Sequence, residues 1–359
     1  MNIGWKPWDL ALERWRRETG DPDLRIEKVL GYDGCSEMYR GFDVPDVHCG
    51  IFPAFKPVVI SEDEEFIVHS DERGITMRDR RDGGSMPEFL EYPVRDPSDW
   101  ERLKTDRLRP EDPGRFAQDW DEFRARVKTT GEAVQVGLFP YGIFGTPRDL
   151  MGDEEILVSF HTNPDMVRDM MDHLTTLWIT LWERIAREVK IDHIHIWEDM
   201  AGKQGSLISS RMVKEFMMPC YDRIADFAGS VGVRVISVDT DGDCSELVPI
   251  FVEHGVNVIL PFEVQAGNDI LEYRKLYPEL GIIGGLDKRA LAGSKADIDA
   301  EVEKAAKMID AGRYIPMFDH LIPPDVPWEN FRYAAEEIKK ICYEQNDGTH
   351  KTDEEVPDD

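Results

Sequence analysis

Carboxylate side chains follow five successive apolar runs in the second half of the sequence, and a histidine accompanies the last of them. They are Glu198 and Asp199 in IWED, Asp239, Asp241 and Asp243 in VDTDGD, Glu263 in PFE, Asp287 in GGLD, and Asp319 with His320 in MFDH. A single acid in such a place is usually a cap for the next helix. Five in succession go beyond that explanation. Converging carboxylates repel one another, so a bound cation, shared protons or basic substrate groups must compensate them.

Two further groups of residues have types that suit a binding site or a core. Phe139, Tyr141 and Phe144 lie in a Gly/Pro-rich segment, where they either line an apolar pocket for an aromatic ring or pack in the core. His193 and His195 alternate along one apolar run and therefore share a face, which favours packing inside a strand.

The elements that must position these residues are predicted from hydrophobic periodicity. Apolar runs at 134–145, 193–200, 233–243, 256–264, 281–287 and 313–323 predict strands. Helices are predicted at 153–189 with a break at Pro164, at 210–229, 244–254 and 268–277, up to 311, and at 327–343. Six strand–helix units predict a parallel sheet with both faces covered, and favour a closed α/β (β/α)₈ TIM barrel. A doubly wound sheet is the alternative, although no Gly-rich phosphate loop follows an early strand.

The N-terminal part differs from this repeat. Residues 5–18 carry tryptophans and a leucine at helical spacing, and 51–77 alternate apolar and polar residues as antiparallel hairpins do. The Gly/Pro-rich segment 82–93 is expected to be an ordered loop. We expect one domain over 1–343, with 1–95 as a hairpin-rich elaboration, and a disordered acidic tail over 344–359. In such a barrel the C-terminal ends of the strands form the catalytic face.

Composition narrows the classes of partner. The 43 Lys and Arg against 72 Asp and Glu give a formal charge of −29, which disfavours nucleic acid and anionic membrane. The five cysteines show no CxxC spacing, so neither a disulfide framework nor a zinc finger is indicated. Without a secretory pattern or a long apolar run, the sequence predicts a cytoplasmic protein.

Several motifs together resemble the uroporphyrinogen decarboxylase superfamily over roughly residues 80–343: GLFPYGIFGTPRDLMG, IWEDMAGKQGSLIS, VDTDGD, PFEVQAG, GGLDK and DHLIPPDVPWENF. That superfamily contains decarboxylases of haem biosynthesis and zinc-dependent methyltransferases that work with corrinoid proteins. The decarboxylases carry an Arg-Gln-Ala-Gly-Arg-Tyr element near the N-terminus, and this sequence has nothing like it. DHLIP nevertheless resembles their late Gly-His-Gly element, with His320 at the family histidine.

The methyltransferase branch holds zinc through a His-x-Cys pair, a glutamate in methionine synthase, and a cysteine after the last strand. The positions that look equivalent here carry Asp239, Asp241, Glu263 and His320. The resemblance therefore implies Zn²⁺ or another divalent metal at these four residues. Carboxylates in place of thiolates leave a harder ion, which suits polarisation of an ether oxygen better than activation of a thiol.

The resulting hypothesis is a metal-dependent methyltransferase of the O-demethylase kind. It moves a methyl group from a methoxylated small molecule to a corrinoid (cobalamin) that a separate protein supplies. His320 belongs to the catalytic group, and Glu198 or Asp199 donates a proton to the leaving oxygen or anchors His320. Asp243, Asp287 and Asp319 are candidates for contact with the substrate. The alternatives are a metal-free decarboxylase acting on a porphyrinogen and a non-catalytic binding barrel; a homodimer stays open.

Overall fold

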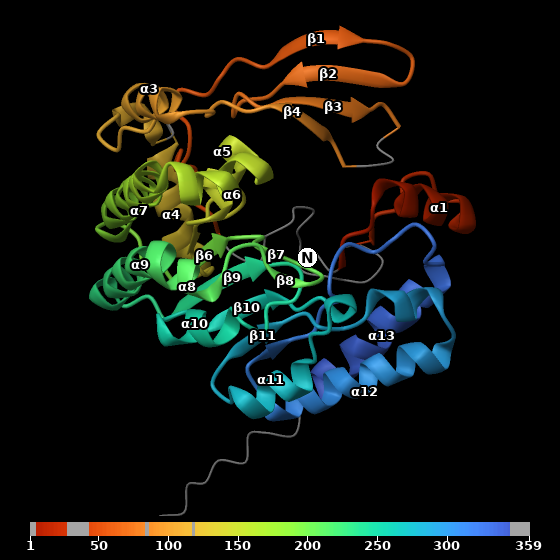
Figure 1. Cartoon of the computed structure of the whole chain (residues 1–359). Helices are drawn as coiled ribbons and strands as arrows, with labels where there is room; N and C mark the ends of the chain where they lie inside the picture. The colour runs from red at the N-terminus through yellow and green to blue at the C-terminus, as the bar shows by residue number, and fades with distance from the viewer. Residues whose placement is uncertain (1–4, 27–42, 83–85, 117–118, 345–359) are drawn as a thin grey trace, which may run out of the picture.

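The computed structural model describes residues 5–26, 43–82, 86–116 and 119–344 (Figure 1). Parts of the expected N-terminal elaboration, 1–4, 27–42 and 83–85, lie outside this range. So does the tail predicted to be disordered, apart from the final residue of the last helix.

The described residues form a parallel sheet of six strands at the six predicted places. The strands are β5 (Gln135–Val136), β6 (His193–Trp197), β9 (Val235–Thr240), β10 (Val258–Pro261), β11 (Gly281–Ile283) and β12 (Tyr314–Ile315). Their order is β12-β11-β10-β9-β6-β5, and every neighbouring pair is parallel. The C-terminal ends of all six therefore lie at the same edge of the sheet. The prediction of a parallel α/β sheet is confirmed.

The prediction of a closed eight-stranded ring is not met by the described strands. Single parallel bridges continue the sheet on both sides: Asp43 pairs with Val134 next to β5, and Pro7 pairs with Ile322 past β12. These bridges do not extend into strands. Pro7 has no N–H to donate, and Pro323 follows Ile322 directly, so the hydrogen-bonded ladder stops there.

Helices cover the outer face of the sheet, as Figure 1 shows for α7, α9, α10 and α11–α13. The described helices are α1 (Asp9–Thr19), α3 (Pro97–Arg107), α4 (Trp120–Thr130), α5 (Gly145–Met151), α6 (Asp153–Thr162), α7 (Pro164–Ala186), α8 (Ser210–Met212), α9 (Met218–Val231), α10 (Val248–Glu253), α11 (Ile270–Leu276), α12 (Lys295–Ala311) and α13 (Trp328–Glu344). Short helical turns are η2 (Pro113–Arg115), η3 (Val213–Met217), η4 (Val264–Ala266) and η5 (Lys288–Ala292). The predicted break at Pro164 separates α6 from α7. None of the described helices combines the length and apolar character that crossing a bilayer requires.

The predicted N-terminal hairpins are an antiparallel sheet of four strands (the hairpin sheet), drawn at the top of Figure 1. Its strands are β1 (Val58–Glu62), β2 (Phe66–Ser70), β3 (Thr76–Arg80) and β4 (Glu88–Glu91). The expectation of a loop over 82–93 is wrong for 88–91, because the pair Met77–Phe89 aligns β4 with β3. A further sheet pairs β7 (Ala201–Gly202) with β8 (Gly205–Ser206). The N-terminal helix α1 packs on α13, where Trp15 stacks on Phe331 with ring centroids 4.5 Å apart.

Candidate functional site

The loops after β9 and β12 bring a carboxylate and an imidazole together at the C-terminal edge of the sheet. Asp241 follows the end of β9 at Thr240, and His320 lies five residues after β12. Asp241 Oδ2 and His320 Nε2 are 3.6 Å apart, although about 80 residues separate them in the chain. Both side chains are partly exposed, at 32% for Asp241 and 26% for His320. They can therefore meet a small molecule that enters this edge of the sheet.

A lysine that the sequence interpretation missed supplies positive charge to this edge. Lys288 Nζ lies 3.6 Å from Glu263 Oε1 and 3.6 Å from Asp319 Oδ1, and only 15% of its side chain is exposed. Glu263 in turn accepts a hydrogen bond from the backbone N–H of Gly242, at 3.0 Å. Lys288 is the last residue of the motif GGLDK and directly follows the predicted acid Asp287. The signal that could have found it is electrostatic: converging acids require a cation.

Burial and neighbouring charges shift the pKa values of the side chains at this edge. Burial raises the pKa of Asp241 well above its ordinary value, and the negative charges of Asp239, Asp199 and Glu263 raise it further, while Lys288 lowers it. Asp241 therefore keeps a proton more readily than an exposed aspartate does. We call Asp199, Asp239, Asp241, Glu263, Lys288 and His320 the mouth cluster.

The imidazole of the mouth cluster favours its neutral form. Burial lowers the pKa of His320, and the charge of Lys288 lowers it again, whereas Glu263 and Asp199 raise it. A neutral imidazole offers one N–H donor and one lone pair. A carboxyl with a raised pKa therefore lies beside an imidazole with a lowered pKa, an arrangement that suits proton transfer between them.

Asp199 is held in the mouth cluster by an arginine and by an unusual backbone conformation. Its φ is +42°, in the left-handed region that non-glycine residues rarely adopt. Arg148 donates to its carboxylate at 2.7 Å and also to its backbone carbonyl. The backbone N–H of Asp199 donates to the carbonyl of Asp239 at 3.1 Å. Strained residues of this kind concentrate at functional sites.

Glu198 has a positioning role, and its expected role as a proton donor is corrected. The side chain is fully buried. Its two oxygens accept bonds from the N–H groups of Ile143, Phe144 and Gly145 at 2.7–3.0 Å and from the hydroxyl of Tyr221 at 2.6 Å. Four donors occupy both oxygens, so Glu198 fixes the loop between β5 and α5 rather than meeting a substrate. A side chain at Gly142 would collide with the carbonyl oxygen of Trp197, which explains how that loop comes so close.

Three of the other predicted acids accept hydrogen bonds from backbone N–H groups. Asp243 accepts from Ser245 N at 2.9 Å, and Asp287 caps η5 by accepting from Arg289 N at 2.9 Å. The helix-cap alternative describes Asp287, whereas Asp243 stabilises a turn before α10. Asp319 is fully buried and accepts from Val264 N at 2.9 Å and from Lys288 N at 3.2 Å. It acts by tying the loops after β10 and β11 together and by holding Lys288 in place.

The three predicted aromatic residues separate. Phe139 is 36% exposed and lines a cavity of about 320 Å³, with Asp199 among the other lining residues. Phe144 is fully buried and packs on Phe160, so it is a core residue. Tyr141 lines a different cavity, next to Trp178, and burial raises the pKa of its hydroxyl.

Inside the sheet, the two strand histidines are packed as expected and bridged by one hydroxyl. His193 Nε2 lies 2.6 Å and His195 Nδ1 2.8 Å from Ser237 Oγ. Burial lowers the pKa of His193 to about 4 and that of His195 to about 3. His195 Nε2 is 4.0 Å from Asp239 Oδ2, so the imidazole of His195 lies next to the mouth cluster.

The four predicted metal ligands fit a divalent ion only in part. Among the described residues, no three or more His, Cys, Asp or Glu side chains are arranged as a ligand set. The separation of Asp241 and His320 does suit two ligands of one ion, because bonds of about 2.0–2.2 Å at a tetrahedral angle leave such atoms roughly 3.5 Å apart. Glu263 is engaged with Lys288 and Gly242. The donor types fit a hard divalent ion, and the pair Asp241–His320 fits in geometry.

Comparisons with known proteins agree with this architecture. Residues 65–341 match the family model described as uroporphyrinogen decarboxylase (URO-D). Among solved structures, a methyltransferase from Methanosarcina mazei superimposes with a TM-score of 0.55 over 95% of this chain and 89% of that chain, at 14% sequence identity. At this identity the likeness is one of fold. No curated protein matches the chain in sequence.

Proposed function

Because the chain belongs to the uroporphyrinogen decarboxylase family, whose fold is a TIM barrel, we propose that it is a methyltransferase. It takes the methyl group of a methoxylated small molecule and passes it to a reduced corrinoid carried by a separate protein. The observation that carries the proposal is the pair Asp241–His320 within the mouth cluster. The fold shared with a protein named as a methyltransferase supports the same reaction class.

The mouth cluster can supply the proton that this reaction needs. When the bond between methyl carbon and oxygen breaks, the electron pair stays on the oxygen, which must then be neutralised. Burial and neighbouring acids raise the pKa of Asp241, so we assign it as the residue that donates this proton to the leaving oxygen. His320 positions Asp241, and Asp199 faces both residues. This assignment moves the proton donor from Glu198 or Asp199 to Asp241.

A divalent cation would take the place of this proton rather than add to it, because a carboxylate that binds a metal is deprotonated. Asp241 and His320 would hold it, with Asp239 and Glu263 as the further donors. It would polarise the ether oxygen as a Lewis acid. Lys288 holds Glu263 in the structure as it stands, so Glu263 has to exchange that contact for the ion.

The test is methyl transfer to free cob(I)alamin from a methoxylated donor, followed by the absorbance of methylcobalamin. Asp241→Ala should lower the rate by about 100-fold or more, the range for loss of a general acid. Asp222→Ala is the matched control, because Asp222 pairs with His254 away from the mouth cluster. Wild-type protein that transfers no methyl group from any methoxylated donor would refute the proposal.

The family description also supports a second candidate, decarboxylation of a carboxylated ring compound without a metal. Lys288 would then hold a substrate carboxylate. About one tightly bound divalent ion per purified chain favours methyl transfer. Metal-free protein that binds and decarboxylates a porphyrinogen favours the second candidate.

A further inference from the structure

A cavity of about 320 Å³ lies between the hairpin sheet and the mouth cluster. It is lined from the hairpin side by residues on and beside β3 and β4, and from the barrel side by the ends of β5 and β6. The lining residues that carry the argument are Met77, Met86, Phe89, Phe139, Trp197 and Asp199. Its volume is at the lower end of the range for small-molecule pockets, about 300–1,000 Å³. It therefore suits a molecule with a single ring.

The apolar lining is suited to a flat ring. Phe139 and Trp197 meet edge to face with ring centroids 4.7 Å apart. Met77 and Met86 line the hairpin side; methionine is flexible, polarisable and makes favourable contacts with aromatic rings. Met86 is 67% exposed and Phe89 41% exposed, although both line a hollow. Covering this exposed apolar surface with a ring removes it from water, which makes binding more favourable.

The charged lining favours a neutral ligand. Arg73 donates to Asp71 at 2.7 Å and to Asp149 at 2.6 Å. Arg148 donates to Asp153 at 2.6 Å and to Asp199 at 2.7 Å. Both guanidinium groups of the lining are thus already engaged with carboxylates. A ligand carboxylate would meet three acids of the lining and would have to break one of these pairs.

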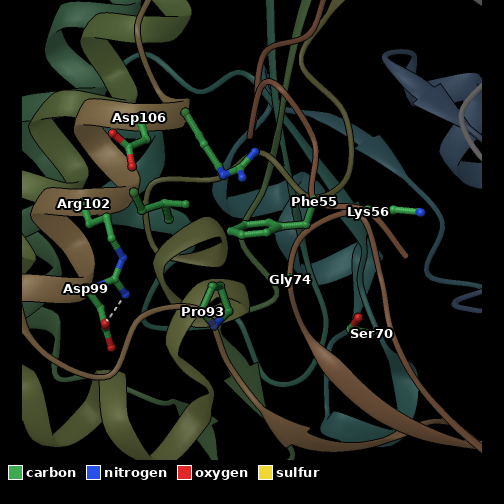
Figure 2. Close-up of a pocket in the computed structure, with 10 residues that line it drawn as sticks. Phe55, Lys56, Ser70, Gly74, Pro93, Asp99, Arg102 and Asp106 are labelled. Carbon is green, nitrogen blue, oxygen red and sulfur yellow. Dashed lines mark hydrogen bonds and ion pairs between the residues drawn. The ribbon is translucent and has the colours of Figure 1, made fainter. Parts of the chain in front are cut away.

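The cavity is continuous with the mouth cluster through Asp199, which belongs to both. A ring held against Phe139 and Trp197 has its edge at Asp199, and the charge of Asp199 acts on Asp241 and His320. A substituent on that edge would therefore lie beside Asp199, the residue that the cavity shares with the mouth cluster. A second cavity of about 370 Å³, between Phe55, Ser70 and α3, has no residue of the mouth cluster in its lining, and its Asp99 and Arg102 pair with each other (Figure 2).

We propose that the cavity beneath the hairpin sheet binds an uncharged, single-ring aryl methyl ether, with the ring between Phe89 and Phe139 and the ether oxygen towards Asp199. This inference rests on the proposed function and adds the substrate class to it. The hairpin sheet thereby becomes the element that determines specificity.

The experiment is calorimetric titration of the full chain with 4-methoxyphenol and with 4-methoxybenzoate, at about pH 7.5. At this pH Asp149 is ionised, because burial raises its pKa only to about 6. The neutral ether should bind at least about tenfold more tightly than the carboxylate, a difference of about 1.4 kcal/mol. Phe89→Asp should weaken binding of the neutral ether by a similar factor. Ile60→Asp is the matched control, because Ile60 is an exposed apolar residue of β1 in the same sheet and does not line the cavity.

Equal binding of the two probes, or unchanged binding by Phe89→Asp, would overturn this inference. Both substituted residues are exposed, so each variant should unfold at the same temperature as the wild type. The assay contains no corrinoid. If the neutral ether binds but no methyl group is transferred in the cob(I)alamin assay, only the proposed function is contradicted. If methyl transfer occurs from a non-aromatic donor and Phe89→Asp does not change its rate, only this inference is contradicted.

Discussion

Lys288 is the residue on which the charge balance of the mouth cluster depends. Its ammonium lies between Glu263 and Asp319, and it lowers the pKa of Asp241. Removal of one partner from a largely buried ion pair leaves the other charge uncompensated, which costs more than the pair contributes.

We therefore expect Lys288→Met to lower the free energy of unfolding by about 2–3 kcal/mol at about pH 8. The loss should be smaller at about pH 5, because the neighbouring carboxylates take up protons and their mutual repulsion falls. Urea denaturation at the two pH values measures both effects. Lys275→Met is the control, since Lys275 is an exposed partner of Glu272. An equal loss at both pH values would show that Lys288 contributes packing alone.

The roles of some single residues could not be predicted from the sequence. The motif IWED indicates an acid at the end of a strand, but not that the carboxylate of Glu198 turns inward to Tyr221 and the loop of residues 143–145. Such contacts depend on how close a second loop approaches. The sequence did predict Asp241 and His320 as neighbours, because the ends of parallel strands meet at one edge.

At the scale of elements, hydrophobic periodicity was enough to locate all six strands of the parallel sheet and the break between α6 and α7. It missed β4, whose four residues are all exposed and lack an alternating burial pattern. The sequence pattern also predicted a closed ring of eight strands, whereas the described residues form six parallel strands. Single bridges at Pro7 and Asp43 depend on tertiary contacts and leave no periodic signal.

Strand β6 carries a pH-dependent contribution to stability. His193 is buried beside Ser237, and its pKa of about 4 lies below the ordinary value of 6.5. Between these values the unfolded chain binds a proton that the folded chain does not. This contribution is therefore complete above about pH 6.5 and is lost as the pH falls towards 4.

For His193→Gln we expect the drop in the free energy of unfolding between about pH 7.5 and pH 5 to be about 2 kcal/mol smaller than in the wild type. The measurement is urea denaturation at both pH values. His161→Gln, at an exposed position, should leave the drop unchanged. An unchanged drop in His193→Gln would mean that the buried imidazole does not resist protonation.

At the scale of the whole molecule, the fold divides the work between two sheets. The parallel sheet gathers residues from distant parts of the chain at one edge, and the hairpin sheet encloses the cavity beside that edge. The family's sequence motifs indicated the first sheet's site. The cavity could not be predicted, because its wall comes from an N-terminal elaboration whose placement over the barrel depends on contacts such as Arg73–Asp149.

The central claim is that Asp241 and His320, carried by strands on different sides of β10, act as one unit. A double-mutant cycle on methyl transfer to cob(I)alamin tests it most directly, with Asp241→Asn, His320→Gln and the double variant. The rate of each single variant should fall by about 100-fold or more. The rate of the double variant should fall no further than that of the less active single variant, as it does for residues of one catalytic unit. Losses that multiply, or single variants as active as the wild type, would contradict the claim.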